Sequence, residues 1–246
     1  MRQVSWQALA PLPRVSRYIR GKRSYTWEER VADYEKLLKE PVLITAEMMT
    51  PILHAERQST HLDGILASAV LTDHPHPSAF GDIVTIPLPL DLVWVSSSGY
   101  PLWASTPLVP VDGGIVSREY WHKRYPSHRA EFGNKQSANT SAGRWREFRV
   151  PVAAHSTSKL VAMAIGNMAE LQRLLDGVTH IGKKSSIGYG RVVKWEVIPH
   201  PHTLEDVLSN RAVPVESGLT DGRIERHRGW TPPYWHAAKW LDCIVP

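Results

Sequence analysis

The segment from residue 158 to residue 198 limits the possible folds more than any other part of the chain. Lys159 to Ile165 is a short apolar run rich in strand-forming residues, which predicts a buried strand. Asn167 followed by Glu170 is typical of a helix start, and Gly177 stands where a C-terminal helix cap belongs. The predicted apolar face of this helix consists of Met168, Leu171, Leu174 and Leu175.

A glycine-rich loop, His180 to Gly190, follows this helix and leads into a second predicted strand, Arg191 to Ile198. An earlier part of the chain repeats the order, with a strand at Val42 to Met49 and a helix at His61 to Thr72. Short apolar pieces broken by prolines, typical of edge strands, come after it in residues 83–111. Two βαβ-like halves are what a ferredoxin-like, or RRM-like (βαββαβ), domain requires, so we predict an α+β fold.

The other segments surround this domain. A Thr26 and Glu29 capping box and helical spacing of apolar residues predict an amphipathic helix over residues 27–39. The predicted boundaries are a basic N-terminal arm and helix (1–40), a first part of the domain (41–111), a basic middle insertion (112–144), a second part with the glycine-rich loop (145–198) and an irregular C-terminal strap (199–246).

Positive charge is concentrated in three segments. Residues 1–27 hold six Lys or Arg and no acid, residues 118–149 hold eight against three Glu, and residues 180–194 hold four and no acid. Most of the acidic residues lie elsewhere, so the basic segments could form one surface. A net charge of +5 and a pI near 9.3 are compatible with a polyanionic partner without requiring one.

The cellular setting is also constrained. Cys243 is the only cysteine, which excludes an internal disulfide framework, and the first residues contain no apolar stretch of signal-peptide type. No apolar run approaches the roughly 20 residues that would span a bilayer. We therefore expect a cytoplasmic protein without membrane contact.

The glycine-rich loop matches part of a nucleotide-binding motif but lacks its chemistry. Gly177 and Gly182-Lys183 fit the G-x-x-x-x-G-K spacing, yet Lys184 replaces the Ser or Thr that would hold magnesium. The predicted order is helix, loop, strand, which is the reverse of the order that directs a helix N-terminus at phosphate. We therefore predict no nucleotide site, no cofactor and no metal.

The loop instead offers donors for a nucleic-acid backbone. Its glycines would allow close approach of the main chain, its lysines and serines can contact phosphates, and Tyr189 could pack against a base or sugar. A solvated surface turn whose glycines serve only chain reversal is the alternative. The candidate contact residues are Gly182, Lys183, Lys184, Ser185, Ser186, Gly188, Tyr189, Gly190 and Arg191 in the loop, Arg118, Trp121, Lys123, Arg124 and Arg129 in the insertion, and Arg17, Arg20 and Arg23 in the arm.

The run Thr179 to Val192 resembles the glycine-rich loop of the RAMP superfamily, the RNA-binding subunits of CRISPR effector complexes. A second match is the strand Leu43 to Met49, then Thr50-Pro51-Ile52, then the helix start His61 to Ala67. Together with Pro232-Pro233-Tyr234-Trp235, these motifs look most like the type IV subunit related to the Cas5 group. The resemblance covers roughly residues 41–240.

This resemblance implies a function and a set of partners. It implies a non-catalytic RNA-binding subunit that caps the 5′ handle of the crRNA, with residues 112–144 as a thumb-like element. The implied partners are crRNA, backbone (Cas7-like) subunits and a large subunit, with target DNA possible nearby. These expectations come from likeness alone.

The main alternative is a metal-independent, crRNA-processing endoribonuclease similar to the Cas6 group. Such an enzyme needs a general base and a general acid near a 2′-hydroxyl and its adjacent phosphate. Among the twelve histidines, four lie in plausible positions, although the sequence establishes no pairing among them: His54, His61, His122 and His128.

Two further patterns have simpler interpretations. His74-Pro-His76 and His200-Pro-His202 resemble metal-ligand spacing, but the prolines and the lack of cysteine partners favour ordinary turns. The ten tryptophans serve equally for base stacking and for protein interfaces. We assign Trp121 and Trp145 to the RNA side, Trp94 and Trp195 to the core, and Trp230, Trp235 and Trp240 to the strap or a neighbouring subunit.

Overall fold

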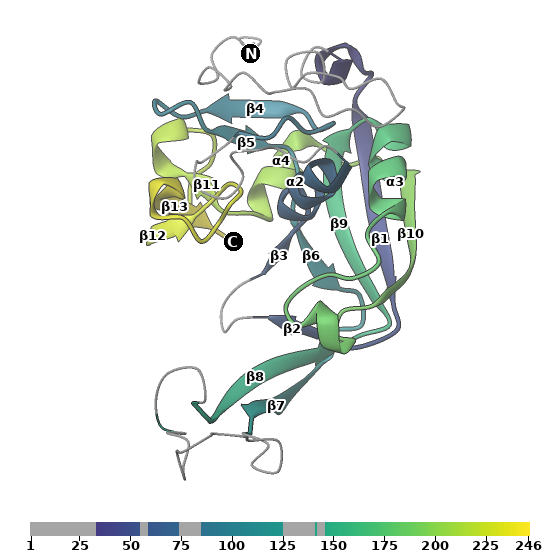
Figure 1. Cartoon of the computed structure of the whole chain (residues 1–246). Helices are drawn as coiled ribbons and strands as arrows, with labels where there is room; N and C mark the ends of the chain where they lie inside the picture. Colours follow the sequence, from purple (N-terminus) through teal and green to yellow (C-terminus); the bar gives the residue numbers. More distant parts are fainter. Residues whose placement is uncertain (1–32, 55–58, 74–84, 125–140, 142–145) are drawn as a thin grey trace, which may run out of the picture.

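The computed structural model describes residues 33–54, 59–73, 85–124, 141 and 146–246. Its largest element is a five-stranded antiparallel sheet with the order β10-β1-β9-β6-β3 (Figure 1). The long strand β1 (Glu40–Met48) pairs with β9 (Lys159–Gly166) on one side and with β10 (Val192–Pro199) on the other. β6 (Pro107–Pro110) and the two-residue β3 (Thr60–His61) complete the sheet.

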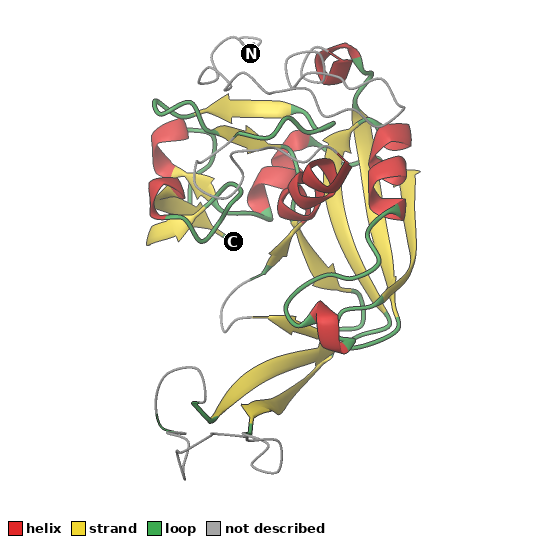
Figure 2. Ribbon diagram, in the orientation of Figure 1, coloured by secondary structure: helices red, strands yellow, loops and turns green. Residues whose placement is uncertain are grey.

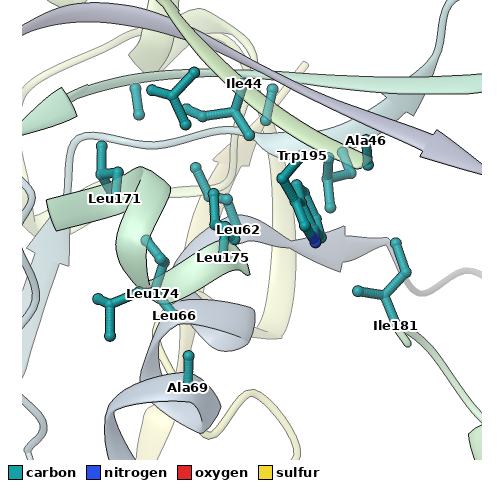
Figure 3. Close-up of a cluster of buried hydrophobic side chains, with 14 of the residues drawn as sticks. Ile44, Ala46, Leu62, Leu66, Ala69, Leu171, Leu174, Leu175, Ile181 and Trp195 are labelled. Carbon is teal, nitrogen blue, oxygen red and sulfur yellow. The ribbon is translucent and has the colours of Figure 1, made fainter. Parts of the chain in front are cut away.

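Helices α2 (Leu62–Asp73) and α3 (Met168–Asp176) pack on one face of this sheet (Figure 2). Alternation along the strands directs Ile44 and Ala46 of β1 toward the helices, into one apolar cluster with Leu66 and Leu174 (Figure 3). Trp195 of β10 is 5% exposed in the same cluster, and its indole nitrogen donates to the Val178 carbonyl at 2.8 Å. The prediction that Trp195 is a core residue is therefore confirmed.

A second, smaller sheet has the order β2-β8-β7. β7 (Ile115–Lys123) and β8 (Phe148–Ser156) form a long antiparallel hairpin that extends away from the main sheet (Figure 1). β2 (Ile52–His54) joins β8 at the base of this hairpin. β8 begins the second part of the domain as bounded from the sequence (145–198), whereas β7 lies in the insertion, for which no strand is predicted.

The C-terminal residues build a separate lobe rather than the irregular strap that the sequence predicts. It contains α4 (Leu204–Ser209), the short turns η5 (Val215–Ser217) and η6 (Ala237–Lys239), and a sheet of order β11-β13-β12. Its strands are β11 (Val213–Pro214), β12 (Arg223–Gly229) and β13 (Trp240–Val245). Trp230 and Cys243 are buried in its own apolar cluster, which the ribbon β4 (Leu92–Val95) and β5 (Pro101–Trp103) covers.

Most other expectations about local structure are met. β1, α2, β9, α3 and β10 each coincide with a predicted element to within a few residues, and the fold is α+β as predicted. The helix expected over residues 27–39 instead ends at Lys36, and its first part lies outside the described residues. Asn167 caps α3 by accepting from the Glu170 amide at 3.0 Å, whereas Gly177 at its C-terminus has right-handed geometry (φ −78°) that does not require glycine.

None of the helices among these residues combines the length and apolar character needed to cross a membrane.

Candidate nucleic-acid interface

The glycine-rich loop is fixed in place by main-chain hydrogen bonds to the segment after β1. The Lys183 amide donates to the Leu53 carbonyl at 3.0 Å, and the Gly190 amide donates to the Pro51 carbonyl at 2.8 Å. Thr50 adds two bonds, because its hydroxyl donates to the Gly188 carbonyl at 2.8 Å and accepts from the Arg191 amide at 2.9 Å. The loop therefore has one position relative to the sheet, set largely by backbone groups.

Two of the loop glycines have internal packing reasons to be glycine. Gly190 has φ +68°, and a Cβ placed there would overlap the Ile181 carbonyl. Gly182 has φ +79°, and its Cβ would lie 2.7 Å from Cγ1 of Ile52 and 2.9 Å from the Leu53 oxygen. Gly188 also has a positive φ, but a Cβ there would meet nothing within 4 Å. Close approach of backbone to backbone thus explains Gly182 and Gly190 without any ligand.

The outer part of the loop, residues 183–188, is called the crown here, and side chains make up most of its groups that face solvent. The amides of Gly188 and Gly190 already donate to the carbonyls of Ser185 and Pro51, so they are not available to an anion. Lys183, Ser185 and Ser186 are exposed, the two serines beginning the short turn η4 (Ser185–Ile187). The donors that the crown offers to solvent are therefore mainly ammonium and hydroxyl groups.

The loop also contacts the hairpin through two side-chain pairs. The Lys184 ammonium lies 3.0 Å from the centre of the Trp121 ring on β7, a cation–π contact. The Tyr189 hydroxyl donates to Oε2 of Glu119 at 2.7 Å, and this hydrogen bond raises the pKa of Tyr189. The structure thus brings Lys184 and Trp121, predicted independently as contact residues, into one cluster, and it directs Tyr189 toward the hairpin.

Strand pairing gives the hairpin two different faces. Glu119 and Trp121 point to the loop side, where Trp121 also packs on Phe148 with ring centres 4.5 Å apart. The neighbouring positions must point the other way, since side chains alternate along a strand. That outer face is exposed and carries Arg118, Tyr120, His122 and, on β8, Arg149.

Arg149 and Tyr120 form a stack on this outer face. The guanidinium of Arg149 lies 3.8 Å from the centre of the Tyr120 ring. Both residues line a shallow groove of about 550 Å³ near the end of the hairpin, together with His122, Lys123, Arg124, Glu147 and Phe148. A planar cation over an aromatic ring, surrounded by further cations, is suited to a phosphate chain with unstacked bases.

The structure describes part of the predicted contact set, and the other part lies outside the described residues. Loop residues 182–191 and the insertion residues Arg118, Trp121, Lys123 and Arg124 lie on the loop and the hairpin described above. The remaining predicted residues lie outside the described residues: Arg17, Arg20, Arg23, Arg129, His74, His76, His128 and Trp145.

Of the histidines expected for a nuclease, His61 and His122 lie on different elements, whereas His128 and the side chain of His54 lie outside the described residues. His122 is exposed on the hairpin, whereas His61 precedes α2 and stacks on Tyr234 with ring centres 4.0 Å apart. Burial, with a smaller effect of Arg211 and Arg228, lowers the pKa of His61 to about 3. A general base works best with a pKa near the operating pH, so His61 is poorly matched to that role.

A buried ionic network beneath His61 was missed at the level of sequence. Asp63 in the first turn of α2 accepts from the Tyr234 hydroxyl at 2.6 and 2.8 Å and lies 3.4 Å from the Arg211 guanidinium. Arg211 also donates to the carbonyls of Trp103, Ser105 and Trp230. Burial raises the pKa of Asp63, and the charge of Arg211 opposes this rise.

This network joins the C-terminal lobe to the main sheet. Asp63 and Arg211 are separated by 148 residues, so no local pattern could have paired them. The available signals were that Asp63 and Tyr234 both belong to motifs of the family resemblance, His61 to Ala67 and Pro232 to Trp235. Burial, and then Asp63, raises the pKa of Tyr234 well above its usual value.

The second histidine pair is a structural contact. His202 is buried, and its Nε2 lies 3.1 Å from the Ala164 carbonyl, while its Nδ1 lies 3.1 Å from Nδ1 of His200. Within the described ranges no three His, Cys, Asp or Glu side chains gather as metal ligands would.

Comparison with known proteins identifies the family. No curated protein matches the chain. A family model described as CRISPR type IV associated protein Csf3 matches residues 114–246, which include the hairpin, the glycine-rich loop and the C-terminal lobe. This match covers more than half of the chain and agrees with the resemblance seen in its motifs. The chain therefore belongs to the family of CRISPR type IV associated protein Csf3.

Proposed function

We propose that the protein is a non-catalytic RNA-binding subunit of a type IV CRISPR effector complex and that it holds the 5′ handle of the crRNA. The observation that carries this proposal is the contact of Lys184 with Trp121. It joins the exposed loop crown to the basic hairpin, so that cations from two distant parts of the chain can follow one phosphate backbone.

The proposed domain type is a ferredoxin-like RAMP domain. The order β10-β1-β9-β6 supports it, because α2 connects β1 to β6 and α3 connects β9 to β10. That is the strand order expected of a βαββαβ domain with both helices on one face. The β7–β8 hairpin then takes the place of the thumb-like element.

Charge and exposure support a backbone-reading surface. Lys183, Arg118, Lys123, Arg124 and Arg191 are all exposed on the loop or the hairpin. Exposed cations can contact phosphates, and such contacts position a strand without reading its sequence. The proposed partners are crRNA, the backbone (Cas7-like) subunits and the large subunit, with target DNA nearby; a cytoplasmic location agrees with these partners.

The test compares binding of labelled handle RNA over a range of salt concentrations. Changing both Lys183 and Lys184 to Ala should weaken binding and reduce the salt slope by about one to two phosphate contacts. The charge-matched control is the double change of Lys36 and Arg223 to Ala, two exposed cations away from the loop and the hairpin. An unchanged slope in the loop variant would remove the loop from the RNA site.

The same RNA decides between binding and cleavage. Incubation with the purified protein in the absence of metal should leave the handle RNA intact. Site-specific scission would overturn the non-catalytic assignment in favour of the Cas6-like nuclease. Equal affinity for a scrambled single strand of the same length would remove the handle specificity.

A further inference from the structure

A cleft of about 970 Å³ lies between the main domain and the C-terminal lobe, apart from the hairpin. One wall is made by α2 and by the start of the glycine-rich loop, including Gly182, Ser185 and Ser186. The opposite wall is made by β12, the start of β13 and the segment that contains Tyr234 and Trp235. The cleft therefore opens next to the segment of the loop that carries Lys183 and Lys184.

The lobe wall presents two indole rings to solvent. Trp235 is 72% exposed and Trp240 is 44% exposed, although both residues line the cleft. The Trp240 indole nitrogen donates to the Tyr234 carbonyl at 3.0 Å, which fixes that ring relative to the wall. Large aromatic side chains usually bury most of their surface, so two exposed indoles in one concave site mark a binding surface.

The opposite wall combines apolar side chains with small and hydroxyl-bearing ones. Gly64, Ser68 and Thr72 of α2 line it with small side chains, and Ser185 and Ser186 add hydroxyl groups at the loop end. Small side chains leave space for a flat group, and hydroxyls can donate to or accept from the edge of a heterocycle. The cleft therefore has stacking surfaces on its lobe wall and hydrogen-bonding groups on the opposite wall.

The charge inside the cleft is balanced. Arg228 is the only Lys or Arg among its described lining residues, and it forms an ion pair with Glu225 at 2.5 Å. Asp73 is likewise paired with Arg173 at 2.8 Å. A phosphate would find no uncompensated cation there, whereas Lys183 and Lys184 lie directly beside the cleft residues Gly182 and Ser185 in the chain. The interior suits an uncharged ring, and the rim suits its phosphate.

We propose that this cleft receives one unpaired nucleobase of the bound RNA, which stacks on Trp235 or Trp240 while its phosphates remain on the loop crown. This inference rests on the proposed function and adds a base-binding site formed by the C-terminal lobe. The lobe then has a direct role in holding RNA, beyond supporting the main sheet.

The test is photocrosslinking of the full-length protein to handle RNA that carries a single 5-iodouridine, moved along the handle one position at a time. We expect at least one position to crosslink to the peptide that contains Trp235 or Trp240. Trp235→Ala and Trp240→Ala should reduce affinity, by roughly ten-fold for the ring that stacks. Trp235→Phe or Trp240→Phe should restore most of the binding, because a ring remains.

Ile224→Ala is the matched control, since Ile224 is 57% exposed on β12 yet does not line the cleft. RNA that binds the wild-type protein and both Ala variants equally, with crosslinks confined to the loop and hairpin, would overturn the base site and leave the proposed function intact. Failure of the wild-type protein to bind handle RNA would overturn the proposed function itself. Crosslinks at the tryptophans to a neighbouring subunit, and none to RNA, would assign the cleft to a protein segment and reject the base site.

Discussion

The two walls of the cleft are held together by opposite means. The loop wall is fixed by main-chain hydrogen bonds from Lys183 and Gly190 and by glycines that permit close approach of two backbones. The lobe wall is fixed by buried side chains, with Asp63 and Arg211 each 1% exposed beneath the Tyr234 ring. One wall depends on chain geometry, and the other depends on charge.

This difference predicts different kinds of sensitivity. Backbone bonds do not titrate near neutral pH, so the loop wall should respond to added side-chain volume and hardly to pH. Buried ionisable groups are costly to leave without partners, so the lobe wall should respond strongly to the loss of one partner and to acid.

The largest effect is expected from Arg211→Met. This change leaves Asp63 buried with the Tyr234 hydroxyl and the Gly64 amide as its donors among the described residues, and it removes donors from three carbonyls. Loss of one partner of a buried ion pair typically costs about 3–5 kcal/mol of unfolding free energy. Denaturant unfolding monitored by circular dichroism measures this difference.

The double variant Arg211→Met with Asp63→Asn separates charge from packing. It removes the unpaired carboxylate, so it should be more stable than Arg211→Met alone. If the double variant were equally unstable, the hydrogen bonds of Arg211 to the backbone, and not its charge, would hold the lobe wall.

A smaller effect is expected in the loop, from Gly190→Ala compared with Gly188→Ala. Both residues have a positive φ, which costs an L-residue about 1 kcal/mol or more. Only at Gly190 would the new Cβ overlap another backbone group, the Ile181 carbonyl, which raises the expected loss to about 3 kcal/mol. Thermal or denaturant unfolding of both variants checks the order, and equal losses would contradict the packing role of Gly190.

The contrast between the walls also explains what the sequence could predict. β1, α2, β9, α3 and β10 each bury one face at a regular spacing, and such local patterns are legible in a single sequence. The loop lysines and the hairpin cations were found from composition, but their proximity depends on the pairing of β7 with β8. That pairing had no signal, since every residue of β7 is exposed or only half-buried.

The sheet of the C-terminal lobe could not be predicted from the sequence for a related reason. β12 reads Arg-Ile-Glu-Arg-His-Arg-Gly, and its burial pattern shows no buried residue, so it lacks the apolar alternation of a half-buried strand. It forms a strand because β13 pairs with it, with Ile224 opposite Ile244. Asp63 and Arg211 meet only after both the sheet and the lobe are assembled, so their pairing is a consequence of tertiary structure alone.

The effect that is smallest for each pH unit is a pH dependence at the contact between His61 and the lobe wall. The pKa of His61 falls from 6.5 in the unfolded chain to about 3 in the fold. Between these two pH values the unfolded state binds a proton at His61 and the folded state does not. Stability should therefore fall as the pH drops from about 6.5 toward 3, by at most about 1.4 kcal/mol per pH unit from this group. His61→Phe keeps a ring on Tyr234 and removes the titration, so its unfolding free energy should fall less steeply with acid. Gly188→Ala, a change in the loop wall, should follow the wild-type slope. If the curves of unfolding free energy against pH coincided for wild type and His61→Phe, the His61 imidazole would be protonated within the fold and the lobe wall would admit water.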